Sequence, residues 1–175
     1  MPESPPQQGD AILPAMVDIS RLAGDGWEDY RDVRLAALCD APSAVGSRLD
    51  DERDRSEAEW RARLERRTQF VARDDGRLVA TVGCLAGEDG EAELVSMWVA
   101  PEARGSGVAD RLVGAILDVA REQGHGTTVL WVSDGNRAAE RLYERHGFGR
   151  TGRVQPIDDD DPTRGMEFEM RRDER

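Results

Sequence analysis

An anion-binding loop is the first chemical feature that the sequence offers. It consists of six consecutive residues, Arg104, Gly105, Ser106, Gly107, Val108 and Ala109. An apolar segment ends just before it at Pro101, and an amphipathic segment begins within it. The first amides of a helix lack partners within the helix, and the helix dipole attracts anions to that end. Because glycines let the backbone approach a phosphate closely, we predict a phosphate-binding loop, with an ordinary strand-to-helix turn as the alternative.

Two well-known nucleotide-binding patterns do not fit this loop. A Rossmann fingerprint requires a third glycine at the position where Asp110 stands. A Walker loop ends in Gly-Lys-Ser or Gly-Lys-Thr, and the sequence contains no lysine. A nucleotide-binding module is therefore disfavoured.

The loop is expected to join a strand to a helix within a βαβ unit. Residues 92–100 are predicted to form the strand, and apolar residues then recur at helical spacing from Val108 to Gly124. Residues 127–133 are rich in β-branched side chains, which favours a second strand. Strands joined by a crossover helix run parallel, so these two strands should be parallel.

The remaining elements predict a mixed α/β class. We expect strands at 12–20, 69–73, 78–85, 148–154 and 166–170, and helices at 27–39, from Ser56 to about Arg67, and between Asn136 and Gly147. Ser56 and Glu59 form a capping box, and residues 74–76 signal a hairpin turn. No element is predicted in the polar segment 43–55. The length of 175 residues suits one domain, 12–175, after a mobile tail at 1–11.

Composition excludes several classes of function. The net charge of -12 disfavours nucleic-acid binding, because an acidic surface repels phosphates. No apolar run approaches the ~20 residues that span a bilayer, and residues 1–10 do not resemble a signal peptide. We therefore expect a cytoplasmic protein without membrane contact. Cys39 and Cys84 lack metal-ligand spacing, so we expect buried thiols and no metal site.

The loop and its surroundings resemble the GNAT acetyltransferase superfamily. Arg104, Gly107 and Ala109 match motif A of that family, Arg/Gln-x-x-Gly-x-Gly/Ala, and residues 136–148 resemble its motif B. Residues 31–42 and Trp60 look like the first two helices of bacterial members, so the resemblance covers roughly residues 12–172. It implies a mixed sheet of six to seven strands flanked by about four helices. The parallel strands 92–100 and 127–133 would splay apart.

The resemblance also implies acetyl-CoA as cosubstrate. The pantetheine arm would lie between the splayed strands and pair with the backbone at Trp98 and Val99, while amides of residues 104–109 would hold the pyrophosphate. Asn136 matches the motif B asparagine that contacts the cofactor, although a helix N-cap is an equally good interpretation. Trp98 and Trp131 are either core residues or part of the acetyl pocket.

The implied reaction is direct attack of a neutral amine on the acetyl thioester. Tyr143 matches the motif B tyrosine and is the candidate general acid, with simple aromatic packing as the alternative. Glu93 lies where some family members carry a strand glutamate that acts as a base through water, and Glu91 is the alternative base. A solvated strand glutamate would have neither role.

The acceptor cannot be identified from the sequence. A small molecule or a peptide fits equally, and a non-catalytic acetyl-CoA-binding sensor is the main alternative to an enzyme. By the resemblance, two acidic loops flank the acceptor entrance: Asp50, Asp51 and Glu52, and Asp158 to Asp161. Their charge favours a cationic amine acceptor, with an ordinary solvated charge run as the alternative. Monomer and homodimer both remain open.

Overall fold

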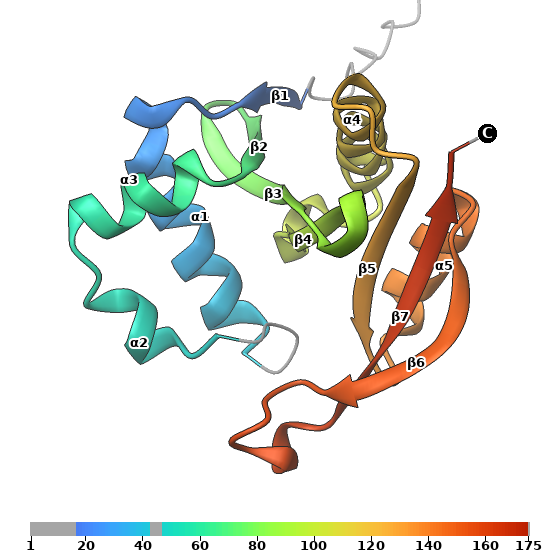
Figure 1. Ribbon diagram of the computed structural model, residues 1–175. Helices are drawn as coiled ribbons and strands as arrows, with labels where there is room; N and C mark the ends of the chain where they lie inside the picture. Colours follow the sequence, from blue (N-terminus) through green and yellow to red (C-terminus); the bar gives the residue numbers. More distant parts are fainter. Residues whose placement is uncertain (1–16, 43–46, 175) are drawn as a thin grey trace, which may run out of the picture.

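The computed structural model describes residues 17–42 and 47–174. Within them, seven strands are present: β1 (Asp18–Arg21), β2 (Thr68–Asp74), β3 (Arg77–Ala86), β4 (Ala92–Val99), β5 (Thr127–Ser133), β6 (Gly149–Pro156) and β7 (Met166–Asp173). They form one mixed sheet in the order β1-β2-β3-β4-β5-β7-β6 (Figure 1). The predicted mixed α/β class and strand number are confirmed.

Five α-helices occur in the described part of the chain: α1 (Trp27–Asp40), α2 (Leu49–Arg53), α3 (Glu57–Glu65), α4 (Val108–Glu122) and α5 (Arg137–Arg145). Figure 1 shows α1, α2 and α3 grouped together, away from α4 and α5. The short helix α2 was not predicted. Glu52, the fourth of its five residues, is fully buried, so tertiary packing rather than local sequence determines this helix.

The N-terminal prediction can be checked only in part. Strand β1 covers the last residues of the predicted strand and pairs antiparallel with β2, with Ile19 opposite Ala72. Residues 12–16 of that prediction, and the predicted tail at 1–11, lie outside the described residues.

Local turn and cap signals are confirmed by the structure. Asp75 and Gly76 connect β2 to β3 with φ angles of 47° and 79°, as a two-residue hairpin turn requires. Ser56 accepts a hydrogen bond from the amide of Glu59, and the Glu59 carboxylate accepts one from the amide of Ser56. These features depend on neighbouring residues only, which is why the sequence predicts them well.

Strands β4 and β5 begin as parallel neighbours and then part. Their ladder consists of Ala92 opposite Thr128 and Glu93 opposite Val129. Beyond Glu93, the register between β4 and β3 shifts, and Ser96 within this irregular stretch has a φ of 57°. The predicted parallel βαβ unit and its splay are therefore present. The splay leaves the edge of β4 beyond Glu93 without a neighbouring strand in the described part of the chain.

Two apolar clusters hold the helices in place. The larger one packs α4, including Leu112 and Ile116, and α5 against the sheet. The smaller one contains Tyr30, Trp60 and Leu64 and joins α1 to α3. Tyr30 and Trp60 meet edge to face, with ring centroids 5.5 Å apart. The second cluster fixes α3, from which several charged side chains project.

The two cysteines differ in their surroundings. Cys84 is buried in the sheet, as expected. Cys39 is exposed, contrary to the prediction, because it lies on the outer face of the last turn of α1.

Candidate active site

A cavity of about 330 Å³ lies where β4 and β5 separate. It is lined by five residues singled out from the sequence: Glu93, Trp98, Trp131, Asn136 and Tyr143. They come from β4, β5, the start of α5 and its interior, so the splay of the sheet brings them together. The cavity is large enough for the reacting end of a cofactor and a small amine.

Tyr143 projects from α5 into this cavity and is almost fully buried. Its ring meets Phe148 edge to face at a centroid distance of 5.8 Å, which fixes its orientation. Burial raises the pKa of the Tyr143 hydroxyl above its ordinary value of 10.0. The hydroxyl is therefore protonated at neutral pH, as a proton donor must be.

Of the two candidate bases, Glu93 is the one that lines the cavity, which Glu167 of β7 also lines. Glu93 is half-buried and is the last residue of β4 that pairs with β5. The alternative candidate Glu91 forms an ion pair with Arg171 at 2.8 Å and does not line the cavity. Of these two candidates, only Glu93 is positioned to accept a proton there.

The glycine-rich loop presents open backbone amides at the start of α4. Gly105 and Gly107 have φ angles of 77° and 84°, which only glycine adopts without strain. Within the described residues, the amides of Gly105, Gly107 and Ala109 have no hydrogen-bond partner. Apart from the adjacent residues in the chain, no atom of the described residues lies within 4 Å of the position that a Cβ would take at either glycine. The loop thus has both the donors and the space to bind a phosphate group.

Other groups of the loop are already engaged. The Arg104 side chain donates to the Val99 carbonyl at 3.1 Å and to the Asp40 carboxylate, which also accepts from the Trp98 indole at 2.9 Å. Ser106 donates its hydroxyl to the Ala103 carbonyl at 2.7 Å. Arg104 and Trp98 therefore fasten the loop and β4 to the end of α1. Asp40 directly follows the predicted helix 27–39, and no local signal in the sequence indicates that it binds Arg104 and Trp98.

Asn136 fits both of its interpretations. Its side chain accepts a hydrogen bond from the amide of Ala139 at 3.2 Å, which caps α5, and it also lines the cavity. Trp131 likewise lines the cavity, and the Arg153 guanidinium lies over its ring at 5.5 Å. Neither residue is part of the main apolar core.

Arg34 is a cavity residue that sequence reasoning missed. It comes from α1, is 4% exposed, and donates to Ser96 at 3.3 Å and to Ser47 at 2.9 Å. It also pairs with Glu52 at 3.5 Å. A buried arginine in an otherwise amphipathic helix carries no distinctive pattern, so only the tertiary structure identifies it.

The acidic entrance differs from the expectation that all seven carboxylates face the acceptor. Glu52 is fully buried, and the guanidinium of Arg63 donates to it. Asp158 and Asp161 both pair with Arg48, at 3.5 and 3.2 Å. Arg48 thereby links the two loops. Among the described residues, Asp51, Asp159 and Asp160 are the carboxylates of this group without an arginine partner.

The described residues hold no group of three or more His, Cys, Asp or Glu side chains that could bind a metal ion. No helix among them is both long and apolar enough to cross a membrane.

Comparison with known proteins gives one family. Residues 30–148 match the model of the acetyltransferase (GNAT) family. Mycothiol acetyltransferase of Clavibacter sepedonicus is 30% identical over 141 residues, which cover 80% of this chain and 45% of that protein. The chain spans about half the length of the curated relatives it matches.

Solved structures share the fold. An acetyltransferase of the GNAT family from Streptococcus pneumoniae aligns with a TM-score of 0.72 at 17% identity, covering 90% of this chain and 99% of that one. A putative acetyltransferase from Salmonella typhimurium, solved with its cofactor acetyl-CoA, aligns with a TM-score of 0.67 at 20% identity, covering 90% and 93%.

Proposed function

This chain belongs to the GNAT acetyltransferase family, and from that premise we propose that it transfers the acetyl group of acetyl-CoA directly to a primary amine of a small molecule or peptide. One observation carries the proposal. Tyr143 and Glu93, a proton donor and a proton acceptor, line one cavity at the point where β4 and β5 part.

The residues present fit acetyl-CoA. The open amides of Gly105, Gly107 and Ala109 would hold the pyrophosphate at the start of α4. The unpaired edge of β4 beyond Glu93 would pair with the amide groups of the pantetheine arm. Trp98 belongs to this edge, whereas the Val99 carbonyl already accepts from Arg104. Acetyl-CoA supplies a thioester whose carbonyl carbon accepts the amine.

Proton transfer defines the roles of the two side chains. An alkylamine has a pKa near ~10, so it arrives protonated and must lose a proton before it attacks. We assign that proton to Glu93, acting through water. As the new C–N bond forms, the nitrogen loses a second proton to water, and as the C–S bond breaks, Tyr143 donates a proton to the departing thiolate and regains one from solvent. Glu93 returns its proton to solvent, so one turnover converts the ammonium and the thioester into an amide, a thiol and one released proton.

The acidic entrance supports a cationic group on the acceptor. Asp51, Asp159 and Asp160 are exposed and without arginine partners among the described residues. Exposed carboxylates at an entrance attract a protonated amine over a distance set by ionic strength. We propose that they guide the ammonium end of the acceptor, whatever the charge of its other end.

Thiol release from acetyl-CoA in the presence of a panel of amines tests the proposed function. Acetyl-CoA should also raise the melting temperature, because a ligand that binds only the folded state stabilises it. A rise in melting temperature without thiol release from any amine would instead identify a non-catalytic acetyl-CoA sensor. No rise and no release would contradict acetyl-CoA binding altogether.

A further inference from the structure

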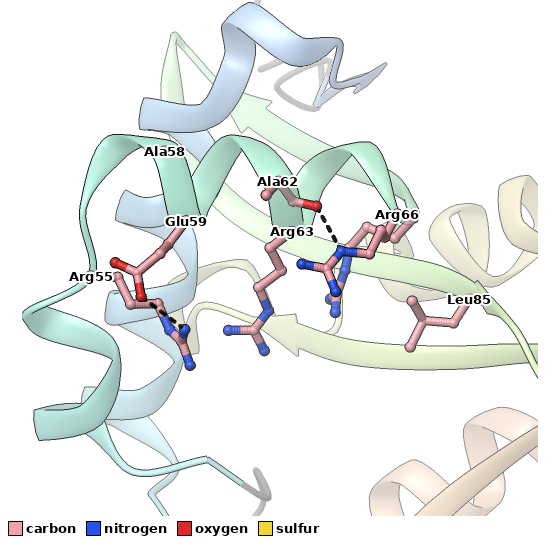
Figure 2. A pocket seen from close by; sticks show the side chains of 8 residues that line it. Arg55, Ala58, Glu59, Ala62, Arg63, Arg66 and Leu85 are labelled. Carbon is pink, nitrogen blue, oxygen red and sulfur yellow. Dashed lines mark hydrogen bonds and ion pairs between the residues drawn. The ribbon is translucent and has the colours of Figure 1, made fainter.

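A second pocket, of about 610 Å³, lies beside α3 and is rich in arginine. Four of its lining residues are Arg55, Arg63, Arg66 and Arg67, and we call it the arginine pocket. Figure 2 shows Arg55, Arg63 and Arg66 projecting from α3 and the turn before it, with Leu85 of β3 at the far end. Such a concentration of guanidinium groups is unexpected in a protein of net charge -12.

The positive charge of the arginine pocket is only partly compensated. Glu52 pairs with Arg55 at 3.0 Å and with Arg63. Glu59, which lines the pocket, pairs with Arg55 at 3.9 Å. Among the described residues, Arg66 and Arg67 form no ion pair. The Arg66 guanidinium donates to the Ala62 carbonyl at 3.1 Å, which leaves its charge uncompensated. The pocket therefore carries a local surplus of positive charge.

Arg67 is the most informative of these residues. Its guanidinium lies over the Tyr30 ring at 5.5 Å, and burial lowers its pKa. Two guanidinium nitrogens, Nε and Nη1, are buried without a hydrogen-bond partner. Buried polar groups usually have partners, because leaving them unpaired costs free energy. An anionic ligand in the pocket would offset that cost.

The arginine pocket and the central cavity are lined by neighbouring residues of the sheet. Leu85, which lines the pocket, is the cross-strand partner of Glu93, which lines the cavity. Cross-strand partners project to the same face and lie next to each other. A second link is made by Glu52, which pairs with Arg34 of the cavity and with Arg63 of the pocket. A ligand that reaches Glu93 therefore has the pocket beside it.

We propose that the arginine pocket binds an anionic oxyacid group, a carboxylate or a phosphate, on the same acceptor whose amine lies at Glu93. This inference rests on the proposed acetyl transfer. Guanidinium groups match such oxyanions in shape and charge, and Arg66 and Arg67 have donors free of carboxylates for them. The acceptor would thus carry opposite charges at its two ends, with the ammonium directed to the glutamate and the oxyanion to the arginines.

Matched acceptors test the charge preference. Aminocarboxylates are compared with their carboxamides, and aminoalkyl phosphates with the corresponding amino alcohols, each as kcat/KM per unprotonated amine. Anionic acceptors should exceed their neutral partners by at least about tenfold, since charge-assisted hydrogen bonds to guanidinium are strong. The two series separate carboxylate from phosphate as the natural group. Equal rates within each pair, or a preference for diamines, would overturn the proposal.

Two arginine variants on the same helix region locate the effect. Arg66→Gln removes an exposed charge that lines the pocket, and Arg61→Gln removes a partly exposed charge outside it. Arg61 pairs with Glu57 at 2.7 Å and does not line the pocket. Arg66→Gln should lower the ratio of anionic to neutral acceptor rates several-fold, and the double variant Arg66→Gln/Arg67→Gln at least about tenfold. Arg61→Gln should leave it unchanged, whereas equal losses in both would indicate a general charge effect and overturn the pocket.

A binding measurement without turnover separates this inference from the proposed function. An N-acetylated aminocarboxylate, without acetyl-CoA, should raise the melting temperature of the parent and of Arg61→Gln but not of the double variant. Thiol release from neutral amines with no such stabilisation would overturn the arginine pocket and leave acetyl transfer standing. Stabilisation with no thiol release from any amine would overturn acetyl transfer, and the acceptor role with it.

Discussion

The two ends of the active site are built in different ways. The donor side, residues 104–109 with the free edge of β4, offers backbone amides from one continuous segment. The acceptor side, the arginine pocket with buried Glu52, is made of side chains from α2, α3 and β3. A backbone site depends on glycines at a few positions, whereas a side-chain site depends on charges that hold one another in place.

This difference has consequences for mutation. A substitution on the donor side should change cofactor binding with little effect on folding. A substitution at Glu52 should affect folding and the acceptor pocket together, because the same carboxylate pairs with Arg34, Arg55 and Arg63. Variants on the donor side, on the acceptor side and at the catalytic residue between them test whether the two sides can be changed independently.

Tyr143→Phe, at the junction of the two sides, should have the largest effect. It removes one hydroxyl and keeps the ring that packs against Phe148. As general acid, the hydroxyl should contribute about 10²–10⁴ in kcat. The measurement is thiol release under saturating acetyl-CoA and acceptor. The stabilisation by acetyl-CoA should stay near that of the parent.

The pH dependence gives a further check on Tyr143. Because burial raises the pKa of its hydroxyl, no loss of activity from Tyr143 ionisation should appear on the alkaline side up to pH 10. A rate for Tyr143→Phe within about threefold of the parent would contradict general acid catalysis and leave Tyr143 a packing residue.

Glu52→Gln should have the next largest effect, on stability. Breaking a buried ion pair by removing one partner costs about 3–5 kcal/mol in the free energy of unfolding. Burial by itself would raise the pKa of Glu52, but the hydrogen bond and charge of Arg63, with the charge of Arg34, lower it to about 2 from 4.5. The carboxylate therefore stabilises the fold fully above pH 4.5, and this contribution is lost as the pH falls toward 2.

Urea unfolding at several pH values measures this effect. The difference between parent and Glu52→Gln should be full at pH 7 and shrink below pH 4.5. Asp51→Asn is the control, because Asp51 neighbours Glu52 on α2 and is exposed. A stability loss for Asp51→Asn as large as that for Glu52→Gln would show that charge on α2 in general matters, rather than the buried ion-pair network.

Gly107→Glu probes the donor side with a smaller expected effect. The new side chain places a negative charge in the open space at the start of α4, where the pyrophosphate should lie. Affinity for acetyl-CoA should fall by at least about tenfold. The new carboxylate would itself interact with the positive end of the helix dipole, and it would repel the negatively charged pyrophosphate. Calorimetric titration with acetyl-CoA measures it.

Gly107→Ala is the matched control for backbone strain. Both substitutions force a side chain into a backbone conformation with a φ of 84°, so both should lose about 1 kcal/mol of stability. Only Gly107→Glu should lose most of its affinity for acetyl-CoA. Equal affinities for the parent and Gly107→Glu would show that the pyrophosphate lies elsewhere.

The loop of the donor side is well predicted by the sequence, and so are local features elsewhere in the fold. The two glycines of the loop, the capping box at Ser56 and the hairpin turn at Asp75 and Gly76 each have a position-specific residue requirement. The splay of β4 and β5 was expected from the family resemblance. The fold was therefore largely predictable, because most of its elements are indicated by sequence signals that span only a few residues.

The acceptor side was not predicted, for a physical reason. Arg63, Arg66 and Arg67 occur in an arginine-rich stretch that by itself suggests a solvated helix face. Their role depends on Glu52 from another helix and on Leu85 from a strand. That these residues lie close to the arginines cannot be derived from their separation in the sequence. The same holds for Asp40, which joins Trp98 and Arg104 only in the folded protein. The sequence suggested that seven carboxylates line the acceptor entrance, but in the structure several of them form ion pairs with arginines.

The remaining acidic side chains should give the smallest effect, and they test how far the acceptor side extends. Asp159 and Asp160 lie in the loop between β6 and β7, are exposed, and have no arginine partner among the described residues. Asp159→Asn/Asp160→Asn should lower kcat/KM for a protonated amine about two- to threefold at low salt, because steering by exposed charges is weak and acts mainly on association. The difference should vanish near 0.5 M salt, since the Debye length there is well below the ~8 Å of physiological ionic strength. Asp75→Asn, a change of the same kind at an exposed residue of the β2–β3 turn, should have no effect at either salt concentration. A difference that persists at high salt would mean that these aspartates contact the acceptor directly, so that the acidic loop, and not only the arginine pocket, forms its binding site.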